Sequence, residues 1–271
     1  MGDLKGVRIA FLEARMSSEL TDLVRRQGGE PYAVPAVRES LLDCSEQVVS
    51  FIDGLSHNSF QIVVFLTGVG VNTLFQEAQR LGLISELVAG LKNVIIVCRG
   101  PKPSVALKRN GLQTLVSVQE PYTTKELLEA ISKLDLLNKG VALIHYGEQN
   151  STLTNALQAS GARLTELCLY EWLMPEDTTP LNHLVQQIIN AQVEVVVFTS
   201  QIQARHLFQV ASDQGLELEL GKALNQLTVV SIGPTCTSVL RSLGIEPDVE
   251  PEHPKMAPMV IALVQYLNQK A

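Results

Sequence analysis

The chain lacks the cysteine pairs and histidine patterns that mark metal centres and redox sites. Its four cysteines, Cys44, Cys98, Cys168 and Cys236, stand far apart without a C-x-x-C pair. We therefore expect reduced, mostly buried thiols, because free cysteine packs as a small hydrophobe. The five histidines form no H-x-x-x-H pattern. No metal site is predicted.

Long apolar runs are also missing. Apolar segments such as residues 62–66 and 193–198 are far shorter than the roughly 20 residues that a membrane-spanning helix needs. Residues 1–6 lead into a short apolar stretch and then charges, unlike the apolar region of a signal peptide. We expect a cytoplasmic protein that does not bind membranes.

Positive charge is in deficit, since the formal net charge is −7. Nonspecific nucleic-acid binding depends on neutralising phosphates, so no nucleic-acid partner is expected. A polyanionic ligand would have to be met by a local concentration of hydrogen-bond donors. With 271 residues, of which 46% are hydrophobic, the chain has enough apolar material for two domain cores.

The chain reads as two copies of one unit when it is aligned against itself. One constant offset places residues 62–67 on residues 195–200 and residues 74–76 on residues 207–209. Further matches at this offset are Gly82 with Gly215, Gly100-Pro101 with Gly233-Pro234, Leu107 with Leu240, Gly111 with Gly244 and Pro121 with Pro254. The pattern indicates an internal duplication.

Each copy is predicted to contain a buried strand, a hydroxyl-bearing turn, a helix, a second strand, a Gly-Pro turn and a second helix. The β-branched runs that begin at Ile62 and Val195 lack polar alternation, which is typical of parallel strands covered on both faces. Gly111 and Gly244 stand where a helix C-cap favours a left-handed residue. The fold class is therefore α/β, with two doubly wound parallel-sheet lobes.

The first strand–helix units of the two copies also match. Residues 7–11 and 141–145 are expected strands, and each is followed by a helix that ends near Gly28 or Gly161. The exit segments, residues 30–37 and 163–172, contain strand formers and could pair as a connector between the lobes. The pattern leaves open which lobe each first unit joins.

The turn Thr67-Gly68-Val69-Gly70 follows a strand and opens a helix, a place where backbone N–H groups form an anion site. As a nucleotide fingerprint it is weak, because Thr73 replaces the third glycine and Arg99 ends the next strand. A carboxylate site is favoured over a nucleotide site, with a plain strand-to-helix turn as the alternative.

Four turns are predicted to lie on the binding edges of the lobes, because ligands of open α/β sheets bind outside the carboxyl ends of the strands. These turns begin near Thr67, Arg99, Ser200 and Gly233. Arg99 and Lys102 add cationic donors, and arginine suits bidentate capture of a carboxylate. Taken singly, each charge is more often a solvated surface residue.

Several short segments occur in the order seen in uroporphyrinogen-III synthases. They are residues 65–71, residues 99–103, residues 146–148, Tyr170 before Pro175, and residues 232–235 before Leu240. The chain resembles this family over essentially its whole length. The resemblance implies two lobes joined by a two-stranded linker, with the N-terminal unit packed into the lobe of the C-terminal third.

On that likeness, one lobe comprises about residues 1–36 plus 176–271 and the other about residues 44–165. Residues 37–43 and 166–175 are then the linker segments. Oligomeric state is not readable from composition, and the resemblance implies a monomer.

The resemblance also implies an activity. Such a lyase takes hydroxymethylbilane, a linear tetrapyrrole with eight carboxylates, and removes water from it. It then closes the ring with the last pyrrole inverted, through an azafulvene and a spiro-pyrrolenine. This chemistry needs positioning and an acid near the departing hydroxyl, and no cofactor.

By the same resemblance, Tyr170 assists departure of the hydroxyl, since a phenol stays protonated at neutral pH. The plain alternative is that Tyr170 is an amphipathic connector residue. The predicted substrate-binding residues are Thr67, Gly68, Val69, Gly70, Arg99, Gly100, Lys102, Tyr146, Gly147, Ser200, Gln201, Gly233, Pro234 and Thr235.

Two positions depart from the family pattern. Cys236 stands where many relatives have a second threonine or serine, and Leu66 replaces a common threonine, which leaves Thr67 as the hydroxyl of its turn. A noncatalytic two-lobed module that binds tetrapyrroles or regulates is the alternative function. A nucleotide-dependent enzyme is the second rival.

Overall fold

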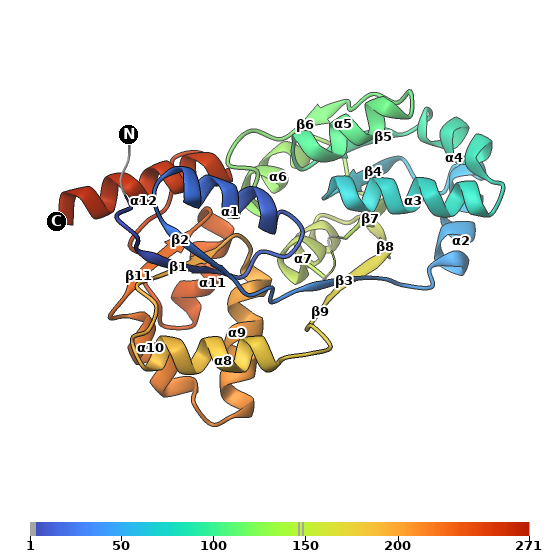
Figure 1. The fold of residues 1–271 in the computed structure, drawn as a ribbon. Coiled ribbons are helices and arrows are strands. Elements are labelled where there is room, and N and C mark those ends of the chain that lie inside the picture. The colour runs from blue at the N-terminus through green and yellow to red at the C-terminus, as the bar shows by residue number, and fades with distance from the viewer. Residues whose placement is uncertain (1–3, 146, 148, 271) are drawn as a thin grey trace. The chain divides into compact units, whose positions relative to one another are not determined.

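The chain divides into two compact units in the computed structural model, which describes residues 4–145, 147 and 149–270. The discontinuous unit consists of Met1–Arg38 and Leu173–Ala271, and the continuous unit of Glu39–Trp172. Figure 1 labels the elements of both. Each unit has its own sheet and its own hydrophobic cores.

The discontinuous unit is built on a parallel four-stranded sheet in the order β11-β10-β1-β2. Its strands are β1 (Arg8–Phe11), β2 (Glu30–Ala33), β10 (Val195–Phe198) and β11 (Thr228–Ser231). Its helices are α1 (Ser17–Arg26), α8 (Thr179–Ile189), α9 (Gln201–Asp213), α10 (Glu217–Leu224), α11 (Pro234–Ser242) and α12 (Met256–Lys270).

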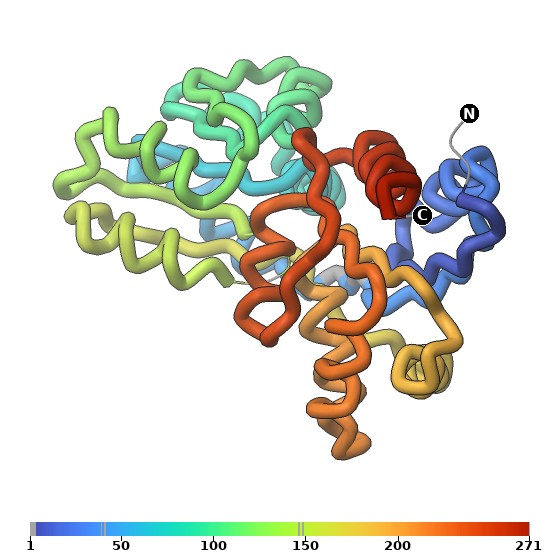
Figure 2. The backbone as a smooth tube through the Cα atoms, turned by 90° about the vertical axis from the view of Figure 1, so that its left-hand side faces the viewer, coloured from blue at the N-terminus to red at the C-terminus, as the bar shows by residue number. Residues whose placement is uncertain are grey.

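Successive side chains of these strands point to opposite faces of the sheet and belong to two separate hydrophobic cores. Ala10 and Val196 pack with helices α8 to α11, whereas Phe11 and Val197 pack with α1 and α12. Helices α1 and α12 lie side by side on their face (Figure 1 and Figure 2). The sheet is therefore covered on both faces, which explains why its central strand reads Val-Val-Val-Phe.

The continuous unit repeats this plan on a parallel five-stranded sheet in the order β6-β5-β4-β7-β8. Its strands are β4 (Ile62–Phe65), β5 (Ile95–Cys98), β6 (Val116–Ser117), β7 (Gly140–Ile144) and β8 (Arg163–Leu167). Its helices are α2 (Ser45–Ser56), α3 (Gly68–Arg80), α4 (Ile84–Leu91), α5 (Pro101–Arg109), α6 (Thr124–Ile131) and α7 (Ser151–Ala159). Helices α2 to α5 cover one face, and α6 and α7 cover the other.

The predicted duplication is confirmed down to the strand register. Val97 of β5 pairs with Val116 of β6, and the same offset that takes Ile62 to Val195 takes this pair to the bridge Val230–Val249. Strand β1 of the first copy pairs with β10 of the second, while β7 of the second copy pairs with β4 of the first. Each sheet therefore combines strands from both copies.

The prediction that the two exit segments pair with each other is right only in part, because the end of residues 163–172 pairs with a strand that begins just after residues 30–37. Strands β2 and β8, which begin these segments, are edge strands of the two main sheets. They pair along their full length with β1 and β7. Only β3 (Arg38–Leu41) and β9 (Tyr170–Leu173) form the separate two-stranded sheet. Residues 30–33 and 163–167 instead complete the two main sheets as edge strands.

The cysteines are free thiols, and three of the four are buried. Burial raises the pKa of Cys236 to about 11 because the thiolate is poorly solvated there. This thiol is therefore neutral at pH 7 and acts as a core side chain. In the part of the chain that the structure describes, no helix is long and apolar enough to cross a membrane.

Candidate functional site

The candidate site of the continuous unit lies at the carboxyl edge of its sheet. Strands β4, β5, β7 and β8 run parallel, so the turns that follow them share this edge. These turns carry the predicted residues Thr67 to Gly70, Arg99 to Lys102, and Gly147. Tyr170 begins β9 shortly after β8. Strand order thus brings distant predicted residues together.

Thr67 caps helix α3 at this edge. Its backbone is extended, and its Oγ1 accepts the N–H of Gly70 at 3.0 Å. Gly70 is buried, and a Cβ added there would lie 3.0 Å from Cγ2 of Ile144. Val69 packs partly against the core. The turn is shaped so that the helix begins directly behind β4.

The N-terminus of α5 lies against that of α3. A Cβ added to Gly68 would be 3.1 Å from the carbonyl oxygen of Lys102, so the two helix starts are in close contact. Gly100 is the N-cap of α5 and packs on the Tyr122 ring. Arg99 is partly exposed and Lys102 is exposed. Two positive helix ends and two cations therefore share one edge, as an anionic ligand requires.

Tyr170 is held inside this edge. It is 1% exposed, and its hydroxyl lies 2.9 Å from Oγ1 of Thr67. The Trp172 ring packs edge-on against it, with centroids 5.5 Å apart. Trp172 in turn covers Gly147, whose φ of +78° favours glycine and whose added Cβ would meet the indole at 2.2 Å. Tyr170, Thr67, Trp172 and Gly147 form one packed group.

The loop that carries Gly147 is anchored by a buried histidine. His145 Nε2 donates to the Glu166 carboxylate at 2.6 Å, and its Nδ1 accepts the Asn150 N–H at 3.4 Å. Thr154 also donates to Glu166, at 2.8 Å. Of the predicted residues, Tyr146 lies outside the described part of the chain.

The equivalent edge of the discontinuous unit is organised by a carboxylate. Glu13, just after β1, accepts hydrogen bonds from the Thr199 hydroxyl and from Gln203 Nε2. The Gln203 amide oxygen accepts the Thr199 N–H at 2.8 Å. Ser200 is the N-cap of α9, and its own side chain makes no capping hydrogen bond within the described structure. Gln201 begins the helix. Ser200 and Gln201 thus stand beside a closed polar network.

The Gly-Pro turn of this unit differs from expectation. The N–H of Gly233, which we predicted as a substrate-binding residue, donates to Ser231 Oγ at 3.3 Å. The Thr237 hydroxyl joins Ser231 to the Glu250 carboxylate. Pro234 has no N–H, and Thr235 is exposed in the first turn of α11. The Thr235 side chain is therefore better placed than the Gly233 backbone to donate to a ligand.

Sequence reasoning missed Glu13, Gln203 and Trp172 as members of these groups. The repeat could have found two of them, because its offset takes Tyr146 to Glu13 and Gly70 to Gln203. Trp172 carries no motif of its own. Its role follows from packing on a glycine that is distant in sequence.

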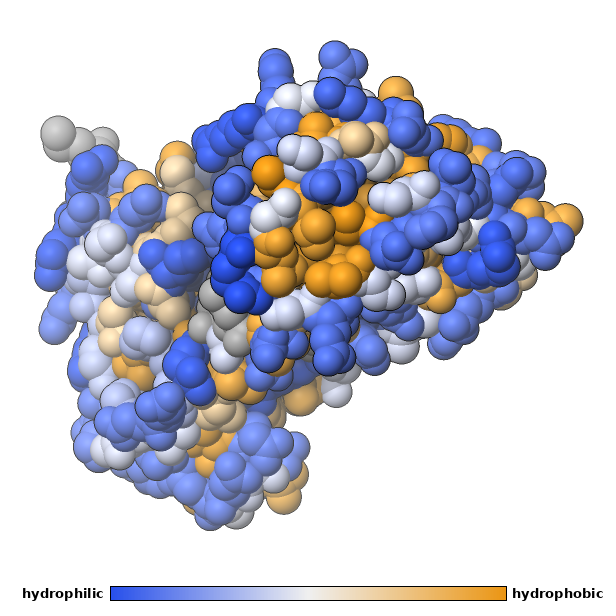
Figure 3. Space-filling model, turned by 90° about the vertical axis from the view of Figure 1, so that its right-hand side faces the viewer, coloured by the Kyte–Doolittle hydropathy of each residue, from blue (hydrophilic) through white to orange (hydrophobic). Residues whose placement is uncertain are grey.

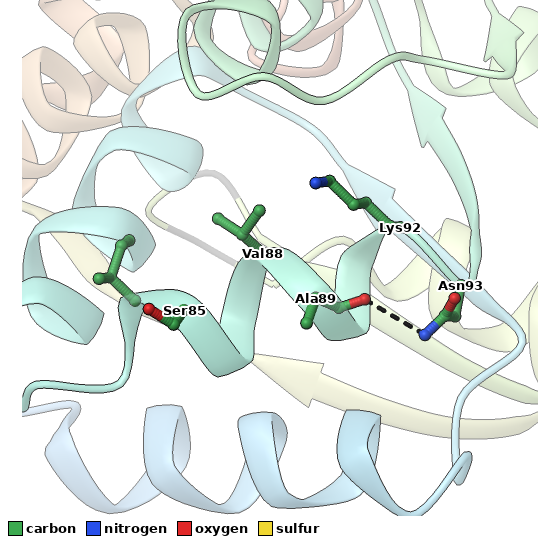
Figure 4. Close-up of a pocket in the computed structure, with 6 residues that line it drawn as sticks. Ser85, Val88, Ala89, Lys92 and Asn93 are labelled. Carbon is green, nitrogen blue, oxygen red and sulfur yellow. Dashed lines mark hydrogen bonds between the residues drawn. The ribbon is translucent and has the colours of Figure 1, made fainter.

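The continuous unit also has two surface depressions. One, of about 480 Å³, is formed by α4 and the residues after it, with Val88 and Lys92 in its lining (Figure 4). An apolar patch is visible on the face drawn in Figure 3. The other, of about 660 Å³, lies between α2 and edge strand β8 and includes Gly140 and Arg163. The first lies near the amino end of β5, whereas the second runs along β8 from Arg163 to Leu167 at its carboxyl end.

Metal ligands do not gather at either edge. Among residues 4–145, 147 and 149–270, no cluster of three or more His, Cys, Asp or Glu side chains could hold a metal ion. The polar groups at the edges are hydroxyls, amides, cations and helix N-termini. They suit binding of an anionic organic ligand.

The fold defines a class of two-unit α/β proteins in which each unit is built on a parallel sheet covered by helices on both faces. The profile of one family, described as "Uroporphyrinogen-III synthase HemD", matches residues 18–261. The chain belongs to the uroporphyrinogen-III synthase family.

Two solved structures of a named synthase agree with this assignment, and one sequence relative is an uncharacterized protein. The chain is 29% identical over 268 residues to a protein of Bacillus subtilis strain 168 named "Uncharacterized protein YjjA", with 98% of each chain covered. A mutant uroporphyrinogen III synthase from Thermus thermophilus superposes with a TM-score of 0.79 at 25% identity, covering 97% of this chain and 99% of that one. Another structure of the Thermus thermophilus enzyme gives 0.58 at 27% identity, covering 96% and 99%.

Proposed function

We propose that the protein converts hydroxymethylbilane to uroporphyrinogen III, as a lyase that removes water and inverts the last pyrrole ring. The observation that carries this proposal is family membership over residues 18–261. The geometry supports it, because the Tyr170 hydroxyl lies 2.9 Å from Oγ1 of Thr67 at the start of α3, and Arg99 and Lys102 flank the start of α5 at the same sheet edge.

In the proposed reaction, Tyr170 donates its phenolic proton to the departing hydroxyl, which leaves as water. The pyrrole ring that carried the departing hydroxyl then transfers its N–H proton to the Tyr170 phenolate. This transfer restores the phenol and leaves a neutral azafulvene. The last ring then attacks this electrophile through its substituted carbon, and the resulting spiro intermediate rearranges with inversion. Burial of Tyr170 excludes competing water from the acid.

Binding of the eight substrate carboxylates is distributed over both units in this proposal. Arg99, Lys102 and the starts of α3 and α5 serve the continuous unit, while Ser200, Gln201 and Thr235 serve the discontinuous unit. The remaining predicted contacts come from Gly68, Val69, Gly100, Tyr146 and Gly147. The N–H groups of Gly70 and Gly233 already donate to Thr67 and Ser231, and Pro234 has no N–H.

Single losses from such a distributed site should weaken the reaction without ending it. We expect Arg99→Ala, Lys102→Ala or Ser200→Ala each to lower kcat/KM by an amount worth about 1 to 3 kcal/mol, the scale of a lost charge-assisted hydrogen bond. Steady-state kinetics on each purified variant measures this. Complete loss of turnover in a folded Ser200→Ala protein would contradict a distributed site.

We also propose that the protein acts as a monomer in the cytoplasm without a cofactor. The net charge of −7 disfavours binding to nucleic acid. The alternative is a noncatalytic module that binds tetrapyrroles through the same edges.

Complementation separates the two functions. A bacterial strain that lacks its own uroporphyrinogen-III synthase should grow without added haem when it expresses this chain. A soluble, folded protein that binds uroporphyrinogen III but does not restore growth would favour the noncatalytic module.

A further inference from the structure

The Thr67 hydroxyl already uses most of its hydrogen-bonding capacity within the protein. A threonine hydroxyl has one proton and two lone pairs. One lone pair of Thr67 Oγ1 accepts the Gly70 N–H at 3.0 Å. The hydrogen bond with the Tyr170 hydroxyl, at 2.9 Å, uses either the proton or the second lone pair. At most one position is left, so direct substrate binding cannot be the main use of this hydroxyl.

The direction of the Thr67–Tyr170 bond decides what Tyr170 can do. If Tyr170 donates to Thr67, its proton points into the protein and is withheld from a leaving group. If Thr67 donates, the phenolic proton can point toward the reaction. A hydrogen bond donated by Thr67 to the Tyr170 oxygen also stabilises the negative charge that develops on this oxygen. The reason is that a hydrogen bond to an ionised acceptor is stronger than one to a neutral acceptor.

The surroundings favour donation by Thr67. Its oxygen already accepts an N–H from the positive end of α3, which polarises the O–H toward its next partner. The Tyr170 ring is buried and backed by Trp172, so its hydroxyl is held beside Thr67.

The other copy of the duplicated unit lacks this arrangement. At the position of Gly70 it has Gln203, which bonds Thr199, and at the position of Thr67 it has Ser200 without a capping bond. The relay from helix N-terminus to threonine to tyrosine is therefore a feature of the continuous unit, and a general strand-to-helix turn does not require it.

We propose that Thr67 is a positioning residue, which donates to Tyr170 and so directs the phenolic proton toward the departing hydroxyl. This inference rests on the proposed role of Tyr170 as the acid. It reassigns Thr67, predicted from sequence as a substrate-binding residue, to a role that acts through Tyr170.

A double-mutant cycle with Thr67→Val and Tyr170→Phe tests the proposal. Thr67→Val should lower kcat by about 2- to 10-fold, the value of one ordinary hydrogen bond, with a smaller change in KM. In the Tyr170→Phe background the same substitution should change kcat by less than about 1.5-fold. Thr67→Ser, which keeps the hydroxyl, should retain nearly full kcat.

Loss of the helix cap is controlled separately. Thr123 caps α6 in the same unit through its own hydroxyl and lies outside the proposed machinery. Thr123→Val should lower the thermal midpoint by about 1 to 8 °C, as an N-cap loss does, and leave kcat unchanged.

Thr67→Asp provides a second test if the valine variant folds poorly. Aspartate is as good an N-cap as threonine, but an ionised carboxylate can only accept, so Tyr170 would have to donate to it. We expect kcat to fall by at least as much as in Thr67→Val.

The outcomes separate the two claims. Equal effects of Thr67→Val in both backgrounds, or full kcat in Thr67→Asp, would overturn the positioning role while leaving Tyr170 as the acid. An unchanged kcat in Tyr170→Phe alone would overturn the proposed acid, and the positioning role would fall with it.

Discussion

Tyr170→Phe is expected to slow formation of the type III isomer by up to about 10²-fold while the fold and substrate affinity are kept. General-acid assistance is typically worth about 10²- to 10⁴-fold, and water can partly replace a phenol donor. The substitution removes one hydroxyl and leaves the ring that packs edge-on against Trp172. The chemical step should therefore suffer more than binding.

The readout of this variant is twofold. We expect a lower kcat and, at limiting enzyme, a larger fraction of the type I isomer, because spontaneous closure competes with a slow enzyme. Tyr266→Phe is the matched control, since it removes a hydroxyl bonded to Asp248 in the other unit and should keep the full rate. A Tyr170→Phe enzyme as fast as the unsubstituted protein would make Tyr170 a structural residue only.

Gly140→Ala is expected to have the largest effect on stability. A Cβ at Gly140, the first residue of β7, would lie 1.8 Å from the carbonyl oxygen of Ser59. Neither backbone can move freely, because Gln61 donates its N–H to the Gly140 oxygen and accepts the Gly140 N–H, each at 2.8 Å. Overpacking usually costs about 1 to 3 kcal/mol, and we expect the upper end of that range or more.

Gly221→Ala should have the opposite sign. Gly221 lies inside α10, and an added Cβ meets no atom within 4 Å among the described residues. Alanine is favoured over glycine in a helix interior by about 0.5 to 1 kcal/mol, so this variant should be slightly more stable.

Denaturant titration measures both glycine variants. The fluorescence of Trp172, the single tryptophan, reports on the continuous unit, where Gly140 lies. Circular dichroism follows helix loss in both units. A Gly140→Ala protein with the midpoint of the parent would show that the close approach of Ser59 is not a real constraint.

The fold was accessible from sequence because the duplication repeats every element at one offset. The runs that begin at Ile62 and Val195 are buried strands, and Gly111 and Gly244 have positive φ after their helices, as predicted. The repeat pattern alone left the assignment of the first strand–helix units open, whereas the family resemblance implied that the N-terminal unit joins the lobe of the C-terminal third. In a duplicated chain, β1 can satisfy the same hydrophobic pattern beside β4 or beside β10, and the folded structure decides between them.

The site was accessible in part. The turns after the strands could be placed at one edge by topology alone, which located Thr67, Gly68 and Lys102. The contact between Thr67 and Tyr170 could not be predicted, because no local sequence pattern relates these two residues. Nor does sequence show that the Gly233 N–H is already taken by Ser231. Side-chain positions are needed to show which hydrogen-bond donors already have a partner within the protein.

The isomer composition of the product tests the proposed function most directly. The purified protein would be mixed with hydroxymethylbilane generated in the same vessel, and the type I and type III products separated after oxidation at several protein concentrations. The account predicts that the type III fraction rises with protein concentration until type III is nearly the sole product. A protein with native tryptophan fluorescence that yields only the type I isomer at every concentration would contradict it.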